Sequence, residues 1–104
     1  MNAVRKDVES LLQKELDSAN KKFPLFHSPH EGYSVILEEV QEAEEELKAV
    51  QTDVDNMWVG VKANNIGSFA FASGLKENAI KLACEAIQVA EMAQKFIDSW
   101  ENKL

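Results

Sequence analysis

Apolar side chains recur every three to four residues along three stretches of the chain, which is the spacing of an amphipathic α-helix. The first stretch predicts a helix from about Asn2 to Lys22, within residues 1–23. It ends before Phe23-Pro24, because proline disfavours continuation of a helix. Its apolar stripe consists of Val4, Val8, Leu11, Leu12, Leu16 and Ala19.

The second stretch, residues 28–64, begins with a clear start signal. Ser28 fits a helix N-cap, Pro29 the first helical position, and Glu31 the acidic residue that completes a capping box. The helical pattern runs to about Val50. After Thr52-Asp53 a further pattern follows, either as a separate helix or as a continuation after a bend; its apolar residues are Val54, Met57, Trp58 and Val61.

The third stretch, residues 74–102, predicts a long C-terminal helix with a wide apolar face from Leu75 to Trp100. A loop is expected at Asn64–Ser68 and a second break at Ser73-Gly74, with the short Phe69–Ala72 segment left unclassified. No stretch alternates as a strand would. The 104 residues therefore predict one all-α domain, a helical bundle whose core is completed by oligomerisation into a dimer or tetramer.

Six of the nine residues from Glu38 to Glu46 are glutamates, and they are distributed unevenly around the helix. Glu39, Glu42 and Glu46 follow one flank of the apolar stripe, whereas Glu38 and Glu45 face solvent. A row of carboxylates beside a buried face repels itself unless a cation lies next to it, and a hard divalent metal takes several carboxylate ligands. The alternative is that the run is only a solvated helix face.

Glu85 is the second unusual carboxylate. Most charges of the final helix are expected on its polar side, but Glu85 shares a flank with Leu82 and Val89. Its partner could be a lysine of another helix. If the acidic helix packs antiparallel to the final one, Glu85 could instead meet Glu39 and Glu42 and complete a divalent-metal site.

Composition excludes several other classes of protein. The net charge is −7 and the eleven basic residues are scattered, so no nucleic-acid partner is expected. No apolar run is long enough for a membrane span, which favours a cytoplasmic protein with no membrane partner. Cys84 cannot form an intramolecular disulfide and is expected to be a small buried hydrophobe. The histidine and cysteine sets of zinc sites, Glu-x-x-His di-iron bundles and catalytic triads are absent.

Three motifs together resemble the MazG-like all-α nucleoside triphosphate pyrophosphohydrolases, in their short single-domain form. They are the Phe26–Tyr33 segment, the Glu-Glu-x-x-Glu motif at Glu38, Glu39 and Glu42, and the segment Glu85–Ala93. The resemblance implies hydrolysis of a nucleoside triphosphate to the monophosphate and pyrophosphate with Mg²⁺, or with Mn²⁺. The implied metal ligands are Glu39, Glu42, Glu85 and Gln88.

The resemblance also suggests roles around those ligands. Glu38 or Glu42 would position or deprotonate the attacking water, and Lys62 and Lys81 would contact the triphosphate. His27, just before a helix start, is placed to help receive an anion.

Position 88 supports a second hypothesis. The family pattern has an aspartate where Gln88 stands here, and an amide oxygen brings no charge to a metal. The alternative function is therefore a non-catalytic helical oligomerisation or binding module that retains the scaffold.

Overall fold

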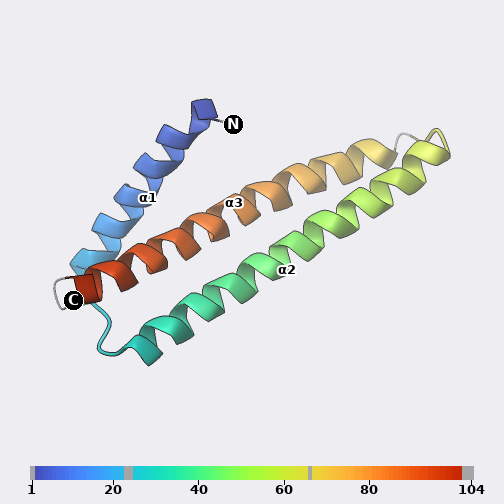
Figure 1. Cartoon of the computed structure of the whole chain (residues 1–104). Helices are drawn as coiled ribbons and strands as arrows, with labels where there is room; N and C mark the ends of the chain where they lie inside the picture. Colours follow the sequence, from blue (N-terminus) through green and yellow to red (C-terminus); the bar gives the residue numbers. More distant parts are fainter. Residues whose placement is uncertain (1, 23–24, 66, 102–104) are drawn as a thin grey trace. The chain divides into compact units, whose positions relative to one another are not determined.

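Three helices make up the computed structural model, which describes residues 2–22, 25–65 and 67–101. They are α1 (Asn2–Lys22), α2 (Pro29–Lys62) and α3 (Gly67–Trp100) (Figure 1). Those residue ranges contain no strand. The predicted all-α fold is confirmed.

The start of α2 follows from its sequence. The Ser28 side-chain oxygen accepts a hydrogen bond from the Glu31 N–H at 3.1 Å, and the Glu31 carboxylate accepts one from the His27 N–H at 3.3 Å. Ser28 is thus the N-cap, as predicted, with Pro29 in the first turn. The reciprocal bond reaches His27, one residue earlier than in the standard capping box.

Helix α2 continues without interruption through Thr52 and Asp53, so the segment from Val54 to Val61 is a continuation. The predicted break at Ser73-Gly74 is wrong, because α3 already begins at Gly67. A glycine inside a helix costs only about 1 kcal/mol relative to alanine, and packing can outweigh that cost. Here Asn78 Nδ2 donates to Asp53 Oδ2 at 2.6 Å and ties α3 to α2 beside Gly74.

The turn between α2 and α3 is built by two asparagines. Asn64 has a φ of 52°, the left-handed conformation that ends many helices. The Asn64 N–H donates to the Val61 carbonyl at 3.1 Å, and the Asn65 N–H donates to the Gly60 carbonyl at 2.9 Å, which is the Schellman pattern. Asn65 then caps α3, since its Oδ1 accepts a hydrogen bond from the Gly67 N–H at 2.8 Å.

The chain forms two compact units. The first comprises residues 1–40 and 86–104, and therefore contains α1 with the first part of α2 and the last part of α3. Its core includes Leu16 and Phe26. The Phe26 and Trp100 rings stack with centroids 6.5 Å apart, and Phe96 tilts against Trp100 at 4.7 Å. Aromatic packing thus organises this unit.

A hydrogen-bonded chain anchors the segment before α2 in the first unit. Ser99 is buried; its hydroxyl accepts from the Phe26 N–H at 3.2 Å and donates to the Lys95 carbonyl at 2.7 Å. Gly32 allows close packing beside it, because a Cβ at Gly32 would lie 2.6 Å from Phe96 Cδ2.

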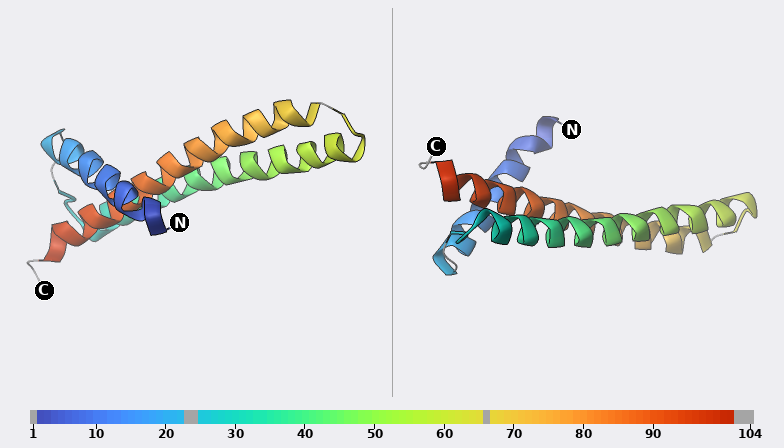
Figure 2. Two further views of the ribbon diagram at one scale, coloured as in Figure 1. Left: turned by 90° about the horizontal axis from the view of Figure 1, so that it is seen from above. Right: turned by 60° about the horizontal axis from the view of Figure 1, so that its bottom comes forward.

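The second unit, residues 41–85, is a helical hairpin. The later part of α2 and the early part of α3 run side by side in opposite directions, joined by the asparagine turn (Figure 2). None of the described residues in this unit is buried. Its exposed large apolar side chains include Leu47, Val54, Trp58, Val59, Val61, Phe69, Phe71 and Ile80.

Two burial expectations are wrong. Cys84 is exposed, because a two-helix hairpin offers no third layer to cover that face. Glu91 and Lys95 are buried, with 5% and 6% of their surface exposed, although the charges of the final helix were expected on its polar side. In the first unit, α1 covers that side of α3: Ala19 of α1 lines the same pocket as Glu91 and Lys95.

Candidate metal centre

Three carboxylates converge where α2 and α3 run beside each other. Glu42 of α2 and Glu85 of α3 belong to the second unit, and Glu39 stands one turn before Glu42 on the same unbroken helix. One carboxylate oxygen from each of the three lies within 4.8 Å of those of the other two. The antiparallel pairing of the helices thus brings together the three carboxylates that the sequence analysis singled out.

The electrostatics of this cluster are those of a crowded negative site. The pKa of Glu85 is raised above its ordinary value by desolvation, by a hydrogen bond with Glu42, and by the negative charges of Glu42 and Glu46. The carboxylates of the cluster thus repel one another, and a cation bound between them would offset that repulsion.

The donor set fits a hard divalent cation. Mg²⁺ and Mn²⁺ take oxygen ligands and tolerate carboxylates, whereas nothing in the cluster offers the nitrogen or sulfur ligands typical of zinc. Glu39 and Glu85 are half-buried, so their charges are less screened than those of exposed glutamates on α2 such as Glu38 and Glu45. The role of these residues as metal ligands stays a prediction.

Glu38 and Gln88 flank the cluster. Glu38 is exposed and precedes Glu39 on α2, one turn before Glu42. Gln88 is half-buried, one turn beyond Glu85 on α3, and it takes part in an interaction. The structure therefore places Gln88 next to a cluster ligand along α3, and Glu38 on the solvent side of α2.

The predicted substrate-binding residues differ in their placement. Lys81 is exposed on α3, one turn before Glu85. Lys62 lies at the end of α2, where its Nζ is 5.6 Å from the centre of the Trp58 ring. At 1.5 Å per residue, Lys62 is about 30 Å along the helix from Glu42. The structure does not bring Lys62 beside the carboxylates.

His27 is exposed and lies just before α2, where its backbone N–H is used by Glu31. Glu39 lies ten residues beyond Pro29, about 15 Å further along the helix axis. His27 is therefore not part of the carboxylate cluster.

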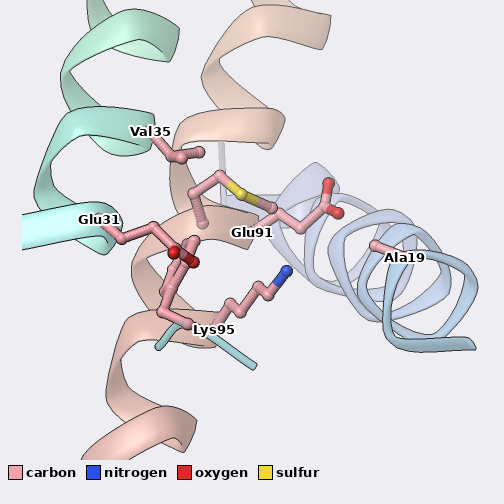
Figure 3. Close-up of a pocket in the computed structure, with 7 residues that line it drawn as sticks. Ala19, Glu31, Val35, Glu91 and Lys95 are labelled. Carbon is pink, nitrogen blue, oxygen red and sulfur yellow. The ribbon is translucent and has the colours of Figure 1, made fainter. Parts of the chain in front are cut away.

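Sequence reasoning missed a pocket in the first unit. Its volume is about 410 Å³, and the buried side chains of Glu91 and Lys95 line it (Figure 3). The apolar stripe of α1 was the available signal, because a third amphipathic helix must cover a second face of the other two.

Comparison with known proteins found no match to the chain among family models, curated proteins or solved structures. Membership of the MazG-like family stays a prediction. In the described part of the chain, no helix combines the length and the hydropathy of a membrane span.

Proposed function

We propose that this protein hydrolyses a nucleoside triphosphate to the monophosphate and pyrophosphate with the help of a divalent metal, as an enzyme of nucleotide-pool housekeeping. The observation that supports this proposal is the convergence of Glu39, Glu42 and Glu85. Such a cluster offers three carboxylate oxygens to a divalent cation, and a metal-bound triphosphate would bring one to an otherwise acidic protein. The reaction itself, release of pyrophosphate from a nucleoside triphosphate, is proposed from the resemblance of the sequence motifs to the MazG-like family.

Each residue of the site has a distinct part in the proposal. Glu39, Glu42 and Glu85 would hold Mg²⁺ or Mn²⁺, which when bound would stabilise the negative charge that develops on the phosphate oxygens. The carboxylate of Glu42 or of Glu38 would orient the attacking water and accept its proton. The Lys81 ammonium would offset part of the charge of the triphosphate. Gln88 would add a neutral oxygen donor where an aspartate would add a charge.

The direct test is pyrophosphate release from a panel of canonical NTPs and dNTPs, with Mg²⁺ and with Mn²⁺. We expect turnover by the wild-type chain and a loss of at least about a hundredfold in Glu42→Gln. Glu45→Gln is the matched control: it makes the same change at an exposed position on the same helix and should retain activity within about twofold. Absence of release by folded wild-type protein with every nucleotide and both metals would contradict the proposal.

Metal binding can be measured independently of turnover. A metal that binds only the folded state raises the melting temperature, by an amount that grows with concentration above the Kd. We expect Mg²⁺ or Mn²⁺ to stabilise the wild type, Gln88→Asp to bind the metal more tightly, and Glu42→Gln to lose the effect.

A non-catalytic helical module is the alternative, and the apolar surface of the second unit supports it. Trp58 and Phe69 expose 57% and 76% of their surfaces in a hairpin that has no buried residue among those described. Residues 47–81 hold four lysines and three acidic residues, so this stretch is nearly neutral in a chain of net charge −7. A second copy can therefore pack here with little repulsion.

We accordingly propose a homodimer or homotetramer, whichever function holds. Light scattering coupled to gel filtration should give a mass above that of one chain, and Phe69→Lys should shift it towards the monomer. A wild-type monomer at micromolar concentration would contradict this part of the proposal.

A further inference from the structure

Exposed apolar side chains of α2 form one continuous stripe in the second unit. Its members are spaced by seven, four and three residues, which keeps side chains on one side of a helix. Each exposes between 44% and 57% of its surface. They are Leu47, Val54, Trp58 and Val61. A stripe of this kind loses its contact with water when another helix packs along it.

This stripe lies beside the contact between α2 and α3 and takes no part in it. Asp53 accepts a hydrogen bond from Asn78 of α3, so Asp53 marks the side of α2 that faces the other helix. Val54 follows Asp53 by one residue and therefore points about 100° away from that side. The hairpin leaves the stripe open to a further helix.

One edge of the stripe carries a row of charges of alternating sign. The row consists of four exposed residues within about 40° of one another around α2: Glu44, Lys48, Asp55 and Lys62. The Nζ of Lys62 lies 5.6 Å from the centre of the Trp58 ring, so this row borders the stripe. Read from either end of α2, each charge of the row matches an opposite charge in the reversed row.

We propose that a second copy of this chain packs along the stripe, with its own α2 running in the opposite direction. In this arrangement Glu44 faces the partner's Lys62 and Lys48 faces the partner's Asp55, and each pair occurs twice. Both pairs are centred on the same part of α2, from Gln51 to Asp53, so one two-fold axis there serves both.

The charges select the antiparallel orientation. A parallel pairing would place the segment 42–46, which contains four glutamates, beside the same segment of the other copy, and like charges repel. The antiparallel pairing places that segment beside residues 58–62, which contain one lysine and no acidic residue. Exposed ion pairs add little affinity, but they fix the orientation of a complex. The stripe thus supplies the attraction and the charged row the direction.

The proposed contact rests on the self-association proposed above, and it adds the surface and the orientation. Glu39, Glu42 and Glu85 belong neither to the stripe nor to the charged row. The contact can therefore form whether or not the protein hydrolyses a nucleotide.

Disulfide cross-linking tests the orientation in a Cys84→Ser protein, which has no other cysteine. Gln51→Cys lies next to the two-fold axis and should give a disulfide-linked dimer on mild oxidation. Val61→Cys is the control on the same stripe. It should stay unlinked, because the two copies of position 61 would lie about 27 Å apart along the helices.

The outcomes separate the orientation from self-association itself. Cross-linking of both variants would indicate a parallel pair. Cross-linking of neither variant, in a protein that light scattering shows to be a dimer, would indicate another surface. Either result overturns the antiparallel contact and leaves self-association intact, whereas a wild-type monomer overturns both.

Exchange of charges tests the row, with sedimentation equilibrium to measure the dimer dissociation constant. Lys48→Glu places a carboxylate opposite the partner's Asp55 and should raise this constant at least about fivefold. Addition of Asp55→Lys restores opposite charges and should return it to within about twofold of the wild type.

Lys76→Glu is the matched control, because it makes the same change at an exposed position of α3. It should leave the dissociation constant within about twofold of the wild-type value. Equal weakening by Lys48→Glu, by the double exchange and by Lys76→Glu would show an effect of net charge alone and would overturn the pairing.

Discussion

The two units of this protein share α2 and α3, but only the first also contains α1, and they bury their side chains to different extents. In the first unit, a third helix and an aromatic group around Phe26 enclose buried residues, including two charged ones. In the second unit, two helices face each other and leave large apolar side chains such as Trp58 and Phe69 exposed. A two-helix layer has only one inner face, so half of its amphipathic surface needs another partner.

The difference shows that the burial of a side chain in this protein depends more on how many helices pack around it than on whether the side chain is apolar. Lys95 is buried because α1 passes over its side of α3, whereas Phe69 is exposed because nothing in the described chain passes over it. The first unit has the features of a self-contained core. The second leaves large apolar side chains exposed, and these form the surface on which the proposed dimer would pack.

The largest effect that can test this comparison is loss of a phenylalanine ring from each unit. Phe26→Ala should lower the free energy of unfolding by about 3–5 kcal/mol, because Phe26 is buried against Trp100 and Lys95. Phe69→Ala should cost less than about 0.5 kcal/mol in the monomer, since the ring is 76% exposed. Urea titration at a concentration that keeps the protein monomeric measures both, and similar losses would contradict the comparison.

A second test places the same methyl group in each unit. Gly32→Ala should destabilise the protein by about 1–3 kcal/mol, because the new Cβ would lie 2.6 Å from the Phe96 ring. Gly74→Ala should stabilise it by about 0.5–1 kcal/mol, since the nearest atom is Asp53 Oδ1 at 3.7 Å and alanine favours the helix. Thermal unfolding of the two variants beside the wild type gives the sign directly, and two changes of the same sign would disprove the assignment.

The smallest effect concerns the buried glutamate of the first unit. The folded-state pKa of Glu91 lies above its ordinary value of 4.5, because of desolvation and the charge of Glu15, partly offset by Lys95. The folded state therefore holds the proton more tightly than the unfolded state, and stability falls as the pH rises from about 4.5 through the raised pKa.

Glu91→Gln should remove this part of the pH dependence and raise stability at neutral pH relative to the wild type. Glu77→Gln, at an exposed position of α3, is the control and should leave the profile unchanged. Chemical denaturation between pH 4 and pH 8 compares the three proteins. A Glu91→Gln profile parallel to that of the wild type would show that Glu91 does not carry the effect.

The local signals predicted most of the fold. Ser28, Pro29 and Glu31 define the start of α2 because capping depends on adjacent residues. Ser73-Gly74 misled the prediction, because a weak local preference for a break was overridden by the contact between Asn78 and Asp53 of the facing helix.

The candidate site was also predictable in part from local sequence signals. Helical periodicity puts Glu39 and Glu42 on one flank and Glu85 on another, and antiparallel pairing is enough to bring them together. The burial of Glu91 and Lys95 was not predictable, because it depends on where α1 packs against α3. The spacing of apolar residues within α3 does not show which part of α3 another helix covers.

The placement of the aromatic residues gives each unit its own optical reporter. The chain has two tryptophans: Trp100 stacks on Phe26 in the first unit, and Trp58 is largely exposed in the second. Emission from a shielded indole is blue-shifted relative to emission from a hydrated one. In a Trp58→Phe protein the fluorescence would follow opening of the aromatic group alone. In a Trp100→Phe protein the fluorescence of Trp58 would report the binding of a second copy over the hairpin. Fluorescence of the two variants would therefore measure unfolding of the first unit and association of the second unit separately.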